Sequence, residues 1–299
     1  MDKRKIIIDT DIGDDIDDAL AIAFALNSPE LELIGITTVF RNTDARAKIA
    51  ANLLHLAGKG IPVYAAYRQP IINREDDLQV PCQYSDDMDG FAYNKDIHAV
   101  DYIISTITES KGDITLVPIG PLTNIGMAVL KCPGLKSKLN EIVLMGGCFY
   151  SHMKEWNIAC DPEAARIVFE SGIPVKAVGL DVTYKCSLSE KELDIIDKSG
   201  SPVTKFLSEL IKRWREKINI LPVLHDPLAV CAVFNDSILE MQNEKIVVET
   251  KGEYTRGMTF NKTGRNWSTD KRSVDSHVKV ARNVDAEAFV KLFIERIVR

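Results

Sequence analysis

The chain has few of the residues that build zinc or redox centres. Its 299 residues include five histidines and six cysteines, and no two cysteines form a C-x-x-C pair. Cysteines scattered in this way are typical of reduced packing residues in a cytosolic protein. We therefore expect no disulfide framework, and any metal site has to be built from other ligands.

The sequence also lacks a long apolar run and a basic run. No apolar stretch approaches the length of a membrane span, and the three isoleucines before the first aspartates are too few for the core of a signal peptide. The net charge is −6, and no basic stripe is interleaved with aromatic residues, which argues against nucleic acid or an anionic membrane as partner. We expect a cytoplasmic protein that binds neither.

Apolar segments of strand length alternate with segments of helical length over the first two thirds of the chain. The strand-like segments are 5–9, 31–39, 62–66, 113–120, 141–147 and 174–182, and helix-like segments include 44–58 and 98–110. This alternation predicts an α/β fold with a mostly parallel sheet covered by helices on both faces. In such sheets, ligands bind beyond the carboxyl ends of the strands.

The last third of the chain has a different pattern. It predicts helices over 202–218 and 226–234, short strands near 245–250 and 278–284, and a final helix from Asp285. Earlier in the chain, residues 74–96 form a polar connection whose length is typical of functional loops. Because there is no repeat, low-complexity tract or linker, we expect residues 1–299 to form one domain.

The densest charge lies where the core is expected to begin. The segment DTDIGDDIDD, residues 9–18, places six aspartates between the apolar runs KIII and ALAIAFAL. Helix capping accounts for at most two of them, and the others repel one another. Asp9 and Asp11 share one face of a strand end, and Asp14, Asp17 and Asp18 share one face of a helix start. Carboxylates without histidine or cysteine suit calcium or magnesium, although the EF-hand spacing is absent.

Other polar residues follow strands that end at the same edge. Thr123 follows the strand in LVPIGPLTN, Met145 ends the strand in EIVLMGG, and Glu155 and Asn157 lie two apart in KEWNIACDPEAA. Two of them have a purely structural alternative, namely a strand-to-helix turn for Thr123 and core packing for Met145. Asp161, directly before a proline, has the pattern of a helix N-cap.

Two further segments carry candidate ligand contacts. His225 and Asp226 begin an apolar helix in LHDPLAVC, where Asp226 is either an N-cap or a metal ligand supplied to the first acidic cluster. Trp267 lies in the polar loop NKTGRNWSTD, where it either stacks on a flat ligand or is an incidental surface residue.

Taken together, these motifs resemble the nucleoside hydrolase family of the inosine-uridine type. The carrying motifs are DTDIGDDIDDALA, TTVFRN, GPLTN, LMGG, EWN, DPEAA and HDPLAV, in the family's order from residue 6 to about residue 235. The resemblance implies a Rossmann-like sheet with one calcium ion at its carboxyl edge. It also implies hydrolysis of ribonucleosides to ribose and free base, and a homodimer or homotetramer.

The resemblance further implies a role for each matching residue. Asp11 would hold the calcium-bound water and take its proton, and His225 would donate a proton to the leaving base. The implied metal ligands are Asp11, Asp18, the backbone carbonyl of Thr123, and Asp226, which also reaches a ribose hydroxyl. The implied ribose contacts are Asp17, Asn42, Met145, Glu155 and Asn157. Candidates for base contact are Arg213, Trp214 and Trp267.

Two departures from the family pattern leave alternatives open. Many relatives have a shorter spacer before DDA, so Asp14 and Asp15 are extra here, and Asp15 could take the role of Asp17 or Asp18. Asp86 stands where many relatives carry a histidine, which leaves the preferred base open. Two other functions compete with hydrolysis. One is a magnesium-dependent phosphatase that uses Asp9 in D-x-D as its nucleophile, and the other is a non-catalytic protein that binds nucleoside or calcium.

Overall fold

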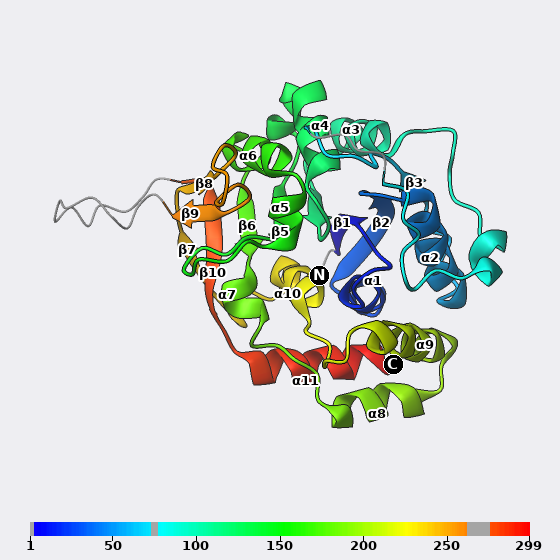
Figure 1. The fold of residues 1–299 in the computed structure, drawn as a ribbon. Coiled ribbons are helices and arrows are strands. Elements are labelled where there is room, and N and C mark those ends of the chain that lie inside the picture. Colours follow the sequence, from blue (N-terminus) through cyan, green and yellow to red (C-terminus); the bar gives the residue numbers. More distant parts are fainter. Residues whose placement is uncertain (1–2, 73–76, 262–275) are drawn as a thin grey trace.

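The computed structural model describes residues 3–72, 77–261 and 276–299 of the chain. Its centre is an eight-stranded sheet with the strand order β3-β2-β1-β4-β5-β6-β10-β7 (Figure 1). Neighbouring strands run parallel except β10 and β7, which are antiparallel. The strands of this sheet are β1 (Arg4–Thr10), β2 (Leu31–Thr38), β3 (Val63–Ala65), β4 (Ile114–Pro118), β5 (Glu141–Met145), β6 (Val175–Val178), β7 (Leu239–Asn243) and β10 (Val278–Val284).

Helices cover both faces of this sheet, as the side chains of β1 illustrate. Ile6 and Ile8 pack into one apolar cluster and Ile7 into the other. Burial of β-branched residues on both faces is typical of a parallel sheet. The helices on the Ile6 side are α1 (Asp17–Leu26), α2 (Thr43–Leu56), α7 (Leu180–Thr183), α8 (Glu190–Ser199), α9 (Pro202–Lys217), α10 (His225–Phe234) and α11 (Ala286–Ile297). Those on the Ile7 side are α3 (Ala99–Glu109), α4 (Thr123–Lys131), α5 (Trp156–Cys160) and α6 (Pro162–Glu170).

Shorter elements complete the described part of the chain. They are the 3₁₀ helices η1 (Asp86–Gly90) and η2 (Pro133–Ser137), and the antiparallel pair β8 (Ile246–Val248) and β9 (Thr259–Asn261). The β8 strand packs against α6. Among the described residues, no helix combines the length and the apolar character needed to cross a membrane.

The α/β fold class predicted from the sequence is confirmed, and the six strand-like segments coincide with β1 to β6, of which β1 extends one residue further at each end than predicted. Asp285 caps the final helix, where its carboxylate accepts a hydrogen bond from the Ala288 N–H at 3.0 Å. The strand predicted over 174–182 is too long, because Gly179 turns the chain into α7 directly after Val178. The strand near 278–284 takes an inner position between β6 and β7, which the sequence pattern did not specify.

The parallel strands bring several connecting segments to one edge of the sheet. The segments that follow β1, β2, β4, β5 and β6 begin at Asp11, Val39, Ile119, Gly146 and Gly179. Since these strands point the same way, all five segments lie at the carboxyl edge. The acidic loop after β1 is therefore surrounded by chain from four other strand ends.

The last helix, α11, packs against the first helix, α1. Phe24 of α1 lies 6.3 Å from Phe289 and 5.6 Å from Phe293 of α11, measured between ring centroids. All three rings are fully buried. The contact fixes the helix that carries Asp17 and Asp18 against the C-terminal end of the chain.

We expect Phe24→Ala to lower the free energy of unfolding by about 3–5 kcal/mol, because the missing ring leaves a cavity in this contact. Urea denaturation measures the change. Tyr254→Ala is the control, because the Tyr254 side chain is 80% exposed, and it should change stability by less than about 0.5 kcal/mol. Equal losses in the two variants would contradict the role given to Phe24.

Candidate active site

The loop between β1 and α1 makes a tight turn at the carboxyl edge. Gly13 has a φ of 122°, and a Cβ at this position would lie 2.7 Å from Cβ of Pro81. Only glycine avoids both the unfavourable backbone conformation and the clash. Ile12 and Ile16 are fully buried on either side of Gly13. They anchor the loop in the core while its acidic side chains face outward from the sheet.

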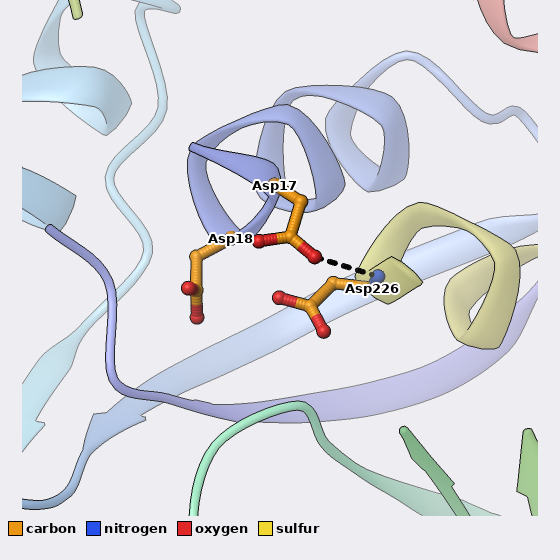
Figure 2. A group of neighbouring side chains, drawn as sticks. All are labelled: Asp17, Asp18 and Asp226. Carbon is orange, nitrogen blue, oxygen red and sulfur yellow. Dashed lines mark hydrogen bonds between the residues drawn. The ribbon is translucent and has the colours of Figure 1, made fainter. Parts of the chain in front are cut away.

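Three carboxylates from two distant segments meet beyond this loop. Asp17 and Asp18 lie in the first turn of α1, and Asp226 lies in the first turn of α10. Each offers an oxygen within 4.8 Å of the other two, and all three residues are buried. Figure 2 shows the side chains converging, with an Asp17 Oδ2 that accepts a hydrogen bond from the Asp226 N–H at 3.2 Å. The Thr10 hydroxyl donates a hydrogen bond to Asp18.

The environment of this cluster opposes negative charge. Burial raises the pKa of Asp17, Asp18 and Asp226 well above the usual carboxyl range, and repulsion from neighbouring carboxylates, Asp11 and Asp15 included, raises it further. In the described part of the chain, no lysine or arginine forms an ion pair with any of them. Buried carboxylates need a compensating cation. An all-oxygen donor set of this kind fits a hard divalent ion such as calcium or magnesium.

The structure separates the other aspartates of residues 9–18 by position. Asp11 is buried, and it lines the cavity beside the cluster. Burial raises the pKa of the Asp11 carboxyl to about 6, while the positive charge of Arg46 acts in the opposite direction. Asp14 and Asp15 also line the cavity, but neither belongs to the group of three. The group of three therefore consists of Asp17, Asp18 and Asp226, and Asp15 does not take the place of Asp17 or Asp18 in it.

Asp9 is turned away from the cavity. It is fully buried, and Oδ1 accepts hydrogen bonds from the Thr37 hydroxyl at 2.5 Å and from Asn124 Nδ2 at 2.8 Å. Desolvation raises the pKa of this carboxyl to about 7. The phosphatase alternative needs Asp9 as an exposed nucleophile, and this geometry does not provide one.

No aspartate is the N-cap residue at either helix of the cluster, although Asp17, Asp18 and Asp226 lie in first turns. The N-cap of α1 is Ile16 and that of α10 is Leu224, and neither helix has a side-chain cap. Asp226 is therefore free of a capping role. Asp161, in contrast, is the predicted N-cap of α6 and accepts hydrogen bonds from Ala164 N at 3.0 Å and from the Thr123 hydroxyl at 2.7 Å.

A cavity of about 550 Å³ opens beside the carboxylates. Part of its lining comes from the ends of β4 and β5 and the start of α5, through Ile119, Met145, Glu155 and Asn157. The Glu155 carboxylate accepts three backbone hydrogen bonds, from the N–H groups of Gly147, Asn157 and Ile158 at 2.7–3.0 Å. The Asn157 side chain donates to the Ile119 carbonyl at 2.7 Å. Both side chains are held rigidly while they face the cavity.

His225 faces the cavity from the start of α10. Its Nδ1 lies 2.6 Å from the Thr183 hydroxyl, and its ring meets Tyr184 edge-on at 5.2 Å between centroids. Burial lowers the pKa of the imidazole to about 4. The ring is neutral at pH 7 and therefore carries one N–H donor.

Several predicted site residues lie outside this cavity. Asn42 caps α2 by accepting a hydrogen bond from Ala45 N at 3.1 Å, and the Thr123 hydroxyl is engaged by Asp161. Neither residue lines the cavity, and the same holds for Arg213, Trp214 and Asp86. Arg213 instead donates to Ser85 Oγ at 2.7 Å and holds the long connection, Trp214 is buried in the core, and Asp86 begins η1. Trp267 lies outside the described residues.

Other residues line the cavity without having been predicted. They are Gln79, Cys82, Arg41, Lys154, Trp156 and Tyr184, with Leu180, Lys217 and Ile218 near the α7 and α9 ends. Lys154 and Trp156 flank Glu155 in the sequence, and this adjacency to a predicted site residue could have indicated that they line the cavity. Gln79 and Cys82 belong to the long polar connection, which agrees with the functional role expected for a loop of that length.

The fold and the site together define an α/β enzyme with a buried carboxylate centre beside a cavity of small-ligand size. Residues 6–291 match the family model described as inosine-uridine preferring nucleoside hydrolase. The chain therefore belongs to the nucleoside hydrolase family, and it is an N-glycosyl hydrolase that acts on ribonucleosides.

Three relatives illustrate the range of the family around this chain. "Probable uridine nucleosidase 2" of Arabidopsis thaliana is 34% identical, over 99% of this chain and 98% of the relative. The pyrimidine-specific ribonucleoside hydrolase RihB of Escherichia coli O1:K1 / APEC is 39% identical, over 87% of each chain. The solved structure of a purine-preferring ribonucleoside hydrolase from Gardnerella vaginalis matches with a TM-score of 0.83 and 32% identity, over 98% of each chain.

We expect Gly120→Ala to lower kcat/KM for ribonucleoside hydrolysis by about 100-fold, the cost of a small misplacement of a reacting group. A Cβ at Gly120 would lie 2.7 Å from both the backbone nitrogen and Oδ1 of Asp11, so that Asp11 must move. Release of reducing sugar measures the rate. Gly134→Ala is the control, because no atom lies within 4 Å of its added Cβ. Wild-type turnover by the Gly120 variant would contradict the position assigned to Asp11.

Proposed function

We propose that the chain hydrolyses the N-glycosidic bond of ribonucleosides in a calcium-dependent reaction. The observation that carries this proposal is the buried group of Asp17, Asp18 and Asp226, without an ion-pair partner in the described part of the chain, at the edge of the cavity. The proposed ligands are Asp11, Asp18, Asp226 and the Thr123 carbonyl. A bound calcium ion would lower the pKa of a water molecule and orient it for attack.

Asp11 is proposed as the general base. Its carboxylate lines the cavity next to the cluster, so it can accept a proton from a water molecule held there. General-base assistance of this kind contributes about 10²–10⁴-fold to a rate. The role also requires Asp11 to stay ionised, and the nearby Arg46 charge supports the ionised form.

The ribose contacts are proposed to be Asp17, Asn42, Met145, Glu155 and Asn157. Cleavage of the glycosidic bond places positive charge on the ribose ring, and carboxylates around it stabilise that charge. Asp17 and Glu155 both line the cavity, which supports a ribose bound next to both carboxylates. Because an unmatched buried polar group is costly, we expect the enzyme to prefer ribose to 2′-deoxyribose. The Asn42 contact is the least supported of these, since its side chain caps α2.

His225 is proposed to protonate the leaving base. The ring lines the cavity, and when the Thr183 hydroxyl donates to Nδ1, the single proton of the neutral imidazole lies on Nε2. This N–H can donate a hydrogen bond to a nitrogen of the departing base, whereas full protonation of the base requires the doubly protonated ring, because a neutral imidazole that lost its one proton would become an anion. Trp267 stays a predicted base contact. The preferred base stays open, because the relatives include uridine-, pyrimidine- and purine-named enzymes.

Three other properties, namely the domain organisation, the oligomeric state and the location, are still predictions from the sequence. A single domain over residues 1–299 is supported by a sheet that contains strands from both ends of the chain, β1 and β10. The homodimer or homotetramer and the cytoplasmic location are expected from the sequence alone.

We expect a chelator to abolish release of ribose from inosine, adenosine, guanosine, uridine and cytidine, because the uncompensated cluster no longer holds a water molecule. Addition of calcium should restore hydrolysis, and the order of rates then ranks the bases. Magnesium added to the same depleted protein is the control for metal identity. Chelator-resistant hydrolysis, or recovery with magnesium alone, would contradict the proposed cofactor.

We expect Asp11→Ala to lower kcat by about 10²–10⁴-fold, the usual contribution of a general base, with the circular-dichroism spectrum and the melting temperature close to wild type. The same preparations are assayed with p-nitrophenyl phosphate and magnesium. Phosphatase activity in the wild type would favour the phosphatase alternative, and ribonucleoside binding without any turnover would favour a binding protein. Near-normal ribose release by the variant would overturn the role of Asp11.

A further inference from the structure

Arg46 of α2 is the one fully buried cationic side chain among the described residues, and it lies directly beneath the acidic loop. Its Nη1 donates hydrogen bonds to the carbonyls of Asp11 and Ile12, the second at 3.0 Å. Its Nη2 donates to Asp14 Oδ2 at 2.7 Å. One guanidinium group therefore contacts three residues of the β1–α1 loop.

The same side chain also contacts the loop that follows the neighbouring strand. Arg46 Nε donates to the Phe40 carbonyl at 2.8 Å. Phe40 and Arg41 have positive φ angles of 70° and 55°, a strained conformation for such residues that persists only where the surroundings impose it. This turn aims the Phe40 carbonyl at Arg46. The guanidinium thus ties the ends of β1 and β2 together.

The acidic loop is also held by the buried side chains of Ile12 and Ile16 and by the Gln83 N–H, which donates to the Gly13 carbonyl at 2.9 Å, and Arg46 adds the charged contact. Residues 11–16 form no helix or strand, although they connect β1 to the turn that carries Asp17 and Asp18. Three acids of this loop, Asp11, Asp14 and Asp15, line the cavity and repel one another. A planar guanidinium with five donors is the side chain best suited to hold several oxygens at fixed angles.

We propose that Arg46 is a positioning residue for the cation site. It fixes the β1–α1 loop so that Asp11 and Asp18 face Asp226, and its charge offsets part of the repulsion among the loop acids before a cation binds. Arg46 does not line the cavity, so it acts through Asp11 and the loop and not on the substrate. This inference rests on the proposed function, because it assigns Arg46 a role toward the proposed calcium ligands.

The test compares calcium binding by the wild type, Arg46→Lys and Arg296→Lys, measured by isothermal titration calorimetry. Lysine keeps the charge but lacks the planar fork. Arg296 of α11 is the matched control, because its guanidinium is also largely buried and pairs with both oxygens of Glu30, at 2.8 and 3.2 Å, outside the cavity. Melting temperatures of the calcium-free proteins report the purely structural cost of each substitution.

We expect Arg46→Lys to raise the calcium Kd by about 10–100-fold, the usual effect of losing a residue that orients metal ligands. Arg296→Lys should leave the Kd unchanged even where it lowers the melting temperature as much. A wild-type Kd in Arg46→Lys, or an equal loss of affinity in both variants, would overturn the inference alone. A wild-type protein that does not bind calcium would overturn the proposed cofactor and this inference with it.

A second measurement needs no variant and covers the case in which Arg46→Lys does not fold. If Arg46 holds the loop before a cation arrives, the Ile12 N–H, which donates to Thr10 Oγ1 at 3.0 Å, should exchange slowly in calcium-free wild-type protein. The Gln83 N–H, which donates to the Gly13 carbonyl at 2.9 Å, should be protected as well. Exchange of both amides at unprotected rates without calcium would contradict a preformed loop.

Discussion

Repulsion among Asp17, Asp18 and Asp226 is the constraint on which the rest of the structure depends. Three carboxylates buried this close together can be ionised only where positive charge compensates them. The protein supplies part of it through the first turns of α1 and α10, because each helix N-terminus carries about half a positive charge. Arg46 supplies more from beneath the loop. The remainder has to come from a bound cation, which couples the stability of this edge of the sheet to the occupancy of the site.

The packing of α1 against α10 is what brings the carboxylates together. Both helices are buried around nearly their whole circumference, so they belong to the interior of the molecule and not to its surface. The Phe24 contact with α11 then fixes α1 from the opposite end. A site assembled from two such rigid helices holds its ligand atoms more precisely than one built on loops. From the loop, Asp11 adds a carboxylate that lines the cavity, and Gly13 provides the tight turn.

Sequence reasoning singled out residues 9–18 because the evidence for a candidate site there is local. Six aspartates in residues 9–18 between two apolar runs have few structural explanations, and the strand–helix alternation predicted the edge at which they lie. Spacing alone left open which aspartates cooperate, since that depends on the approach of Asp226 from about 200 residues further along the chain, and only the family resemblance placed Asp18 and Asp226 together. The N-cap alternative for Asp226 was wrong, because the Asp226 carboxylate lies beside Asp17 and Asp18 of a distant segment and Leu224 is the N-cap of α10. Arg46 gave no local signal, because a single arginine within an otherwise ordinary helix is usually exposed.

The two walls of the cavity differ in how much hydrogen-bonding capacity they leave for a ligand. A carboxylate has about four acceptor sites. Glu155 uses three of them on backbone N–H groups, so that one remains, which suits a single neutral hydroxyl. Asp17 uses one, on the Asp226 N–H, and retains the others for a cation or for several donors. The wall around Glu155 can therefore position a sugar without attracting the cation, whereas the α1–α10 wall remains unsatisfied until a cation is bound there.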